Sequence, residues 1–152
     1  MTALPPLEDR PGFLIRRLHQ IHAAMFQEEC AAFGITPVQY SLMTLLQEHP
    51  GLDQGAAALG LGLDRFATAD VANRLRAAGL LRSEPGRDRR TRALYLTEAG
   101  RRRYAEMAPA VARAHERMVE CLPPQRRAAF LGTLKQLVAQ LDPVGRGRPR
   151  LG

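Results

Sequence analysis

Residues 63–100, LDRFATADVANRLRAAGLLRSEPGRDRRTRALYLTEAG, decide the fold predicted for this chain. Asp64 is a good N-cap for a helix over residues 65–78, and Gly79 ends that helix. Short apolar segments at residues 80–83 and 91–96 flank a turn that contains Pro-Gly, so they predict a β-hairpin. A helix followed by a hairpin with arginine at its tip is suited to lie along a polyanion.

Three short helices precede the hairpin. Thr36-Pro37 begins the first, which ends near residues 49–51. Asp53 caps a second helix over residues 54–59, and a Gly-Leu-Gly turn leads into the helix that starts after Asp64. This order predicts a winged helix-turn-helix over residues 36–96.

Long helices are expected on both sides of this unit. Residues 13–33 carry two neighbouring apolar stripes, and amphipathic patterns also cover residues 97–122 and 125–141. These helices are too apolar to stand alone, so we expect them to pair with the same helices of a second chain. The predicted fold class is mainly α with a small β-hairpin wing: a winged helix-turn-helix plus a helical dimerisation region.

The predicted organisation has four parts. They are a flexible N-terminal arm (1–11), a helical dimerisation region (12–35 and 97–141), the winged helix-turn-helix DNA-binding domain (36–96) and a flexible basic tail (142–152).

Charge is unevenly distributed along the chain. The 152 residues are 45% hydrophobic, enough to form a core, and carry a net charge of +7. Residues 82–103 hold eight arginines against three acidic residues. Positive charge concentrated in one segment indicates an anionic partner there.

Several other classes of protein are disfavoured by what the sequence lacks. Two cysteines are too few for a disulfide framework, no apolar run is long enough for a membrane span, and the N-terminus does not resemble a secretory signal. We therefore expect a cytoplasmic protein with no membrane partner. The sequence also contains no glycine-rich phosphate loop, nucleophile elbow or metal-ligand cluster, so we expect no enzymatic activity, cofactor or metal.

The chain resembles the MarR (multiple antibiotic resistance regulator) family of bacterial transcription factors over about residues 12–141. The likeness is carried by Leu63-Asp64-Arg65, Asn73-Arg74-Leu75, Gly79-Leu80-Leu81-Arg82, Asp88-Arg89-Arg90 and Leu96-Thr97-x-x-Gly100. It implies a homodimer with recognition helices in adjacent major grooves, wings over the minor groove and a small-molecule effector that releases DNA. One departure is the segment Phe66–Asp70, where the family commonly carries serine or threonine early in the recognition helix.

The candidate DNA contacts of the wing are Arg87, Arg89 and Arg90, at or just after the turn. We expect them to contact phosphates and to insert one arginine into the narrow minor groove. Asp88 is expected to pair with one of these arginines and orient it. The alternative is an ordinary solvated loop.

In the predicted recognition helix, the polar candidates for reading base edges are Arg65, Thr68 and Asn73. Arg74 is expected to contact a phosphate or to anchor the hairpin. A salt bridge within the domain is the alternative role for Arg74.

The candidate effector site is expected between the dimerisation and DNA-binding parts. Its predicted residues are Arg16, His19, His22, Tyr40 and Met43. An arginine with histidines in an apolar cleft suits an aromatic or other organic carboxylate. The alternative is a histidine pair packed at a dimer interface, and no third ligand stands out that would make the pair a metal site.

Cys30 raises a second form of regulation, because some members of this family sense oxidants through a cysteine in the first helix. Reactivity needs an exposed thiolate in an electropositive setting. Cys30 instead follows Glu28 and Glu29 and shares a stripe with Phe26, so we expect it in the core. Cys121 is expected to be structural as well.

Together these features predict a homodimeric, ligand-responsive transcriptional regulator, most often a repressor. Its partners are double-stranded DNA with a pseudo-palindromic operator, a second copy of itself and a small effector such as an aromatic carboxylate. The first alternative is an oxidant-sensing regulator that acts through Cys30. A winged helix can also serve as a protein-interaction module or bind RNA, although a pure protein module would not need an arginine-rich wing.

Overall fold

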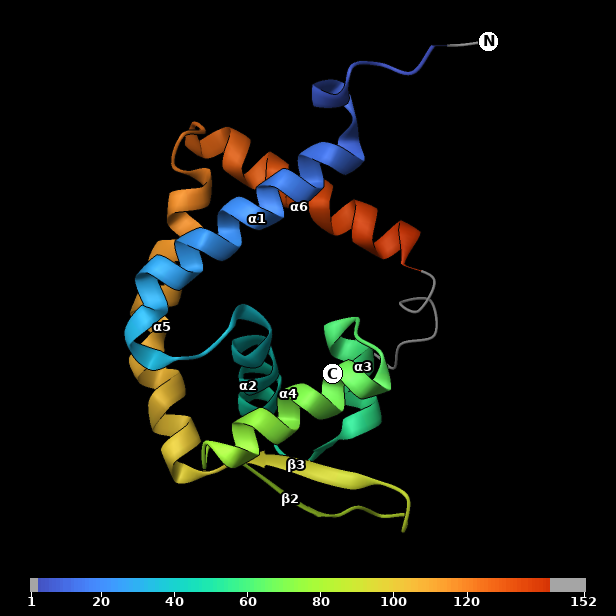
Figure 1. Cartoon of the computed structure of the whole chain (residues 1–152), viewed down its shortest axis with the longest axis vertical. Helices are drawn as coiled ribbons and strands as arrows, with labels where there is room; N and C mark the ends of the chain where they lie inside the picture. Colours follow the sequence, from blue (N-terminus) through green and yellow to red (C-terminus); the bar gives the residue numbers. More distant parts are fainter. Residues whose placement is uncertain (1–2, 143–152) are drawn as a thin grey trace.

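The computed structural model describes residues 3–142 and shows six α-helices with a three-stranded antiparallel sheet (Figure 1). The elements are α1 (Pro11–Cys30), α2 (Pro37–Glu48), β1 (Leu52–Asp53), α3 (Gln54–Leu61), α4 (Arg65–Ala77), β2 (Leu81–Pro85), β3 (Arg92–Leu96), α5 (Glu98–Val119) and α6 (Pro124–Leu141). The predicted fold class, mainly α with a winged helix-turn-helix, is confirmed.

Helix starts follow the capping residues closely. Thr36 forms a full capping box with Gln39 at the start of α2. The side chains of Asp53, Asp64 and Thr97 accept backbone N–H groups at the starts of α3, α4 and α5. Each cap satisfies a donor that the first helical turn leaves free, which is why local sequence predicted these boundaries.

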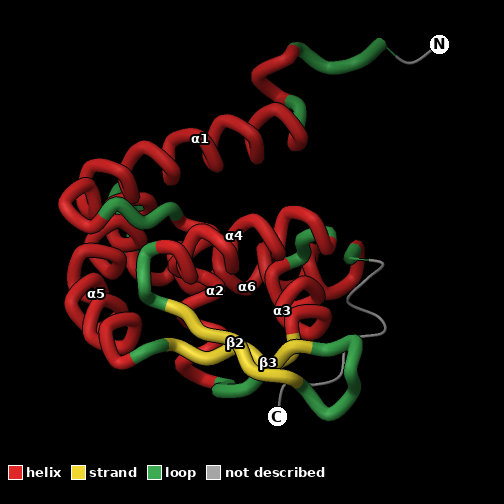
Figure 2. The backbone as a smooth tube through the Cα atoms, turned by 60° about the horizontal axis from the view of Figure 1, so that its bottom comes forward, coloured by secondary structure: helices red, strands yellow, loops and turns green. Residues whose placement is uncertain are grey.

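The sheet has the strand order β1-β3-β2, with the hairpin register Leu81 opposite Leu96. The sequence analysis did not predict β1, which pairs Leu52 with Leu94 and has only two residues. So short a strand has no alternation of its own, and its partner is distant in the sequence. In Figure 2 the tip of the β2–β3 hairpin lies beside α3.

One core joins the helix-turn-helix to the long helices. Its largest fully buried side chains are Phe26, Leu42, Met43, Leu46, Leu75, Leu81, Leu94 and Met107, with Thr68 the one polar member. These residues come from α1, α2, α4, α5 and both hairpin strands. The helix-turn-helix therefore cannot shift independently of α5 without disturbing shared packing.

The long helices α1 and α6 leave apolar surface open. The large hydrophobic residues exposed on them are Leu14, Ile15, Ile21, Leu131, Leu137, Val138 and Leu141. Within the described chain α6 buries no residue, and α1 buries only Phe26 and Cys30. One chain thus covers only part of the wide apolar face predicted for its first helix.

The chain ends differ in detail from the prediction. Leu7–Asp9 form a 3-10 turn within the predicted N-terminal arm, and α1 begins at Pro11. Residues 1–2 and most of the predicted tail, 143–152, lie outside the described residues. None of the described helices is both long enough and apolar enough to cross a bilayer.

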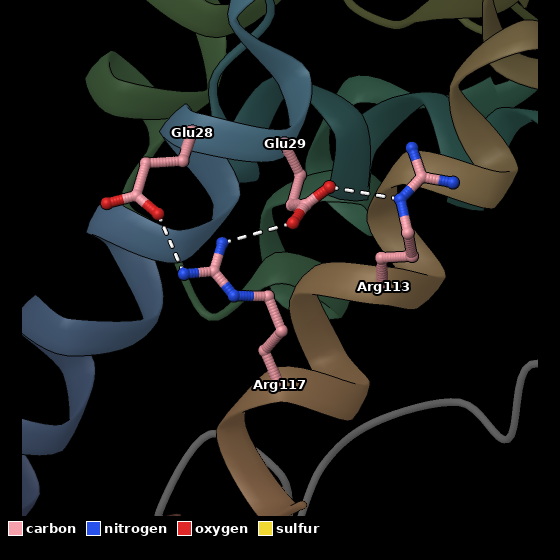
Figure 3. A network of polar contacts seen from close by, with 4 residues as sticks. All are labelled: Glu28, Glu29, Arg113 and Arg117. Atoms are coloured by element: carbon pink, nitrogen blue, oxygen red, sulfur yellow. Dashed lines mark hydrogen bonds and ion pairs between the residues drawn. The ribbon is translucent and has the colours of Figure 1, made fainter.

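Four charged side chains fix the crossing of α1 and α5 (Figure 3). Arg117 donates to Glu28 at 2.7 Å and to Glu29 at 3.1 Å, and Arg113 Nε donates to the second oxygen of Glu29 at 3.0 Å. Glu29 is the best covered of the four. The hydrogen bond from Arg113 is the main reason that the pKa of Glu29 lies below its usual value.

Candidate nucleic-acid interface and effector site

A hollow of about 560 Å³ lies between α4, the wing and the start of α3. Arg65, the first residue of α4, lines it together with Arg90 and Arg92 from the hairpin. The remaining lining residues are Asp53, Gln54, Gly55 and Thr91. The Asp53 carboxylate is engaged in capping α3, so three arginines from two elements dominate this concave surface.

The wing turn is held by its own backbone. Gly86 N–H donates to the Thr91 carbonyl at 2.9 Å, and the Thr91 hydroxyl donates to the Asp88 carbonyl at 3.0 Å. A Cβ at position 86 would collide with Thr91, so this turn requires glycine. The arginine side chains are consequently presented from a braced turn rather than from a free loop.

At the tip, Arg87, Arg89 and Arg90 are exposed, as the predicted phosphate contacts require. The predicted role of Asp88 is wrong. Its carboxylate accepts the backbone N–H of Arg90 at 3.4 Å, and no ion pair joins it to an arginine side chain among the described residues. Asp88 stabilises the turn and leaves the guanidinium groups free to face an anion.

Two further arginines stiffen the hairpin, a role that the sequence analysis did not predict. The Arg82 guanidinium lies over the Tyr95 ring, 4.4 Å from its centroid, and pairs with Glu84. Arg92 donates to the Ser83 hydroxyl at 3.0 Å across the strands. Such cross-strand contacts depend on the register, which the sequence did not specify.

Thr68 was expected on the face of α4 that meets DNA, but it lies on the face that packs into the core. Thr68 is fully buried, and its hydroxyl donates to the Asp64 carbonyl at 2.8 Å. The prediction that Thr68 reads a base edge is therefore wrong. The outward strip consists of Phe66, Asp70 and Asn73, all exposed and spaced four and three residues apart.

Arg74 forms the intradomain salt bridge that was the alternative to a phosphate contact. Its Nε lies 2.9 Å from Asp70 Oδ2, and both side chains are more than 60% exposed. Asn73 accepts a hydrogen bond from Arg76 on the same helix and stays exposed. The charge of Asp70 on the outward strip is thus balanced by Arg74.

Five rings form a continuous aromatic ladder across α5, α1 and α2. His115 stacks on His22 at 4.9 Å, and Tyr104 stacks on Tyr40 at 5.0 Å between centroids. Phe26 bridges the two pairs, 6.5 Å from His22 and 6.4 Å from Tyr40. Two predicted effector residues are therefore connected, and both end members, His115 and Tyr104, come from α5.

Two polar side chains of this ladder, His22 and Tyr40, are biased towards their neutral forms. Burial, with smaller contributions from the neighbouring His115 and His19, lowers the pKa of His22. Burial and Tyr104 raise the pKa of Tyr40 to about 12. His22 Nε2 is buried and has no hydrogen-bond partner among the described residues, so the ladder contains an unsatisfied polar atom.

The other predicted effector residues are not members of the ladder. Arg16 is on the exposed half of α1, with its guanidinium 5.5 Å from the centre of the Phe13 ring, and His19 is exposed. Met43 is fully buried in the hydrophobic core and is not one of the five rings, so its place in an effector site stays a prediction. The sequence could not reveal His115 and Tyr104, because only the packing of α5 on α1 and α2 brings them to His22 and Tyr40.

The cysteines differ from one another. Cys30 is buried as predicted, and burial raises the pKa of its thiol, so it has little thiolate character. Cys121, expected to be structural, is instead exposed and lines a groove of about 450 Å³ with Leu18 and Phe130. That groove lies where α5 meets α6.

Known proteins share this sequence pattern and this fold. A model of the MarR family matches residues 33–91, which span α2 to the wing. The PcaV transcriptional regulator from Streptomyces coelicolor is 30% identical, over 88% of this chain and 98% of that protein, and superposes with a TM-score of 0.74. The chain belongs to the MarR family.

Two further relatives add detail. The transcriptional repressor CouR, solved on a 23-mer DNA duplex, is 28% identical over 91% of this chain and 99% of its own, with a TM-score of 0.82. The putative regulatory protein for the hcr operon of Thauera aromatica is 32% identical over 70% of this chain, and the match spans 65% of that relative. These relatives are transcription regulators, not enzymes.

Proposed function

We propose that this MarR-family regulator is a homodimeric, ligand-responsive repressor that binds a pseudo-palindromic DNA duplex. The observation that carries the proposal is the hollow shared by Arg65 of α4 with Arg90 and Arg92 of the wing. It unites the recognition helix and the hairpin in one basic surface. Such a surface fits a phosphate backbone that passes between a major and a minor groove.

The roles of the individual elements follow from this arrangement. The outward strip of α4 faces base edges in the major groove, and Arg87, Arg89 and Arg90 reach phosphates and the adjacent minor groove. The relative CouR is solved on duplex DNA, which supports DNA as the partner of this fold. Two recognition helices in a symmetric dimer would lie about 34 Å apart, one turn of B-DNA.

Dimerisation is supported by the apolar surface that one chain leaves open. Exposed leucine, isoleucine and valine side chains concentrate on α1 and α6, and α6 buries no residue in the described chain. A second copy that packs against both helices would remove this surface from water. The predicted dimerisation region, 12–35 and 97–141, contains both helices.

The proposed effector is a small aromatic carboxylate that binds at the ladder of His22, Phe26 and Tyr40. Stacked rings suit an aromatic ligand, and the unpartnered His22 Nε2 offers one polar contact. Arg16 and His19, also on α1, are proposed to receive the carboxylate. Among relatives, CouR from Rhodococcus jostii RHA1 is solved with p-coumaroyl-CoA and PcaV with its natural ligand.

Helix α5 provides the route from effector to DNA. It carries His115 and Tyr104 of the ladder, and its cap Thr97 directly follows β3 of the wing. An effector that binds better to a second arrangement of α5 would shift the dimer away from the spacing that matches the operator. The alternative, oxidant sensing through Cys30, is disfavoured by the burial of that thiol.

The test begins with the full-length chain and a random-sequence duplex library. We expect a two-fold symmetric sequence to be enriched and to bind two chains per duplex, measured by sedimentation. Benzoate, 4-hydroxybenzoate and cinnamate are then added to the complex, and fluorescence anisotropy measures how much protein each compound releases from the duplex. Failure to enrich any sequence would refute DNA recognition, and complexes insensitive to every compound would refute the proposed effector class.

Matched variants locate the effector. Arg16→Ala should keep duplex affinity but require a higher effector concentration for release. Arg17→Ala removes the same charge from the next residue of α1, whose side chain bonds to Gln20 at 3.0 Å, and should behave as the parent. Equal responses from both variants would exclude Arg16 from the site.

A further inference from the structure

The side chain of Phe66 is 90% exposed. It is the only large hydrophobic residue exposed between residues 36 and 96, all of which the structure describes. The other exposed large hydrophobics lie before or in α1 and on α6. Phe66 therefore lies apart from the apolar surface assigned to dimerisation and needs a separate explanation.

Its position on α4 is specific. Phe66 is the second residue of the helix, directly after Arg65, which lines the basic hollow. Asp70 and Asn73 follow it on the same outward strip, while Thr68 and its buried neighbours hold the opposite face in the core. Packing within the domain therefore does not use the ring, and the ring points away from the core.

The charges on the outward strip indicate which chemical group Phe66 contacts. Asp70 is paired with Arg74, so the strip next to Phe66 adds little net charge, and attraction to phosphates comes from Arg65 and the wing. In a helix-turn-helix, the N-terminal residues of the second helix contact base edges. The thymine C5 methyl is the apolar group that base pairs present in the major groove.

We infer that Phe66 recognises a thymine in each operator half-site by packing its ring on the C5 methyl. This inference rests on the proposed function, because it takes α4 to be the helix in the major groove. An isolated exposed phenylalanine is unremarkable on a general surface. Here it occupies the base-facing end of α4. Contact between the ring and a methyl group there would remove apolar surface of both from water, which favours binding.

The experiment uses the full-length chain and the duplex enriched from the random library. Each thymine is replaced in turn by deoxyuridine, which removes only the methyl and preserves base pairing. We expect one thymine per half-site to matter, with about a fourfold loss of affinity for one methyl and about 15-fold for both. The same series is then measured with Phe66→Ala, which should bind all these duplexes equally.

Controls separate this effect from a general loss of binding. Arg65→Ala should weaken every duplex but keep the deoxyuridine penalties, and thermal unfolding should show Phe66→Ala as stable as the parent, because the ring has no partner in the fold. The inference is overturned if no deoxyuridine lowers parental affinity, or if Phe66→Ala keeps the same penalties. If either of these outcomes occurs but the parent still binds the enriched duplex tightly, only the inference about Phe66 is overturned and the proposed function stands. If no duplex is enriched, the inference and the proposed function are both refuted.

Discussion

Gly100, in the first turn of α5, packs directly against the carbonyl oxygen of Leu80, just before β2. A Cβ at position 100 would overlap that oxygen. The same carbonyl accepts the Thr97 backbone N–H at 3.1 Å, and the Thr97 hydroxyl donates to the Gly79 carbonyl at 2.7 Å. The Leu-Thr-x-x-Gly motif therefore joins the end of the recognition helix to the start of the helix that carries two of the five rings of the aromatic ladder.

Gly100→Ala should destabilise the protein by about 1–3 kcal/mol, because the added methyl must displace backbone rather than a flexible side chain. Urea unfolding at fixed protein concentration measures the change. Gly12→Ala is the matched control, since Gly12 also lies in a first helical turn but its Cβ would meet nothing within 4 Å. That control should change the free energy of unfolding by less than about 1 kcal/mol. Equal effects at both positions would show that the contact with Leu80 is unimportant.

Arg90→Ala should weaken binding to every duplex, selected or random, because phosphate contacts carry no sequence information. If a dimer makes about 6–10 phosphate contacts, affinity should fall by about 10³–10⁵ between 50 and 200 mM salt. Loss of one contact per chain should reduce the slope of log affinity against log salt by about 1.8. Arg126→Ala, which removes an exposed charge from α6, should leave the slope unchanged. An unaltered slope for Arg90→Ala would exclude this residue from the interface.

Thr68→Val should lower stability without changing sequence preference. The substitution keeps the buried shape and removes the hydrogen bond to Asp64, at a cost of about 1 kcal/mol. Asn73→Ala, on the outward strip, should have the opposite effect. It should alter the bases preferred in a selection and leave the free energy of unfolding unchanged. A changed preference for Thr68→Val would mean that α4 turns its other face to DNA.

Acidification should reveal the ion pairs between α1 and α5. The pKa of Glu29 is lowered in the folded protein, so its stabilising contribution is complete above the usual glutamate pKa and is lost as the pH falls through the lowered value. The difference in unfolding free energy between the parent and Glu29→Gln should therefore be greatest at neutral pH and shrink in acid. Glu116→Gln, an exposed carboxylate on α5, is the control. A difference that does not vary with pH would exclude the ionised carboxylate as the cause.

Cys30 should resist alkylation in the folded protein. Its side chain is buried and burial raises the pKa of the thiol, so the reactive thiolate is scarce. In a Cys121→Ser background, iodoacetamide should add nothing at neutral pH and one adduct in urea, as measured by intact mass. Labelling of the folded variant would restore the oxidant-sensing alternative.

Local chemistry explains which features could be predicted. The caps Thr36, Asp53, Asp64 and Thr97 act on backbone groups within three residues, so the starts of four helices could be predicted from short stretches of sequence. The same holds for the wing, because its Pro-Gly turn is a local signal. Strand β1 was missed because its two residues become a strand only by pairing with β3.

The candidate sites needed the assembled fold. Helical periodicity arranges the residues of α4 into faces, but which face is buried depends on what packs against the helix, and this placed Thr68 inside and Phe66 outside. Similarly, α1 alone gives no indication that His22 stacks on His115.

By itself, the sequence determined the order of the long helices, the helix-turn-helix and the hairpin, the basic wing and membership of the MarR family, because each depends on residues close together in the chain. Only the tertiary structure decided that Arg65 shares a hollow with Arg90, that five rings from three helices form one ladder and that Phe66 points away from the core. The physical reason is that burial and contact are properties of surfaces. A surface here is made from segments that meet only after the chain has folded.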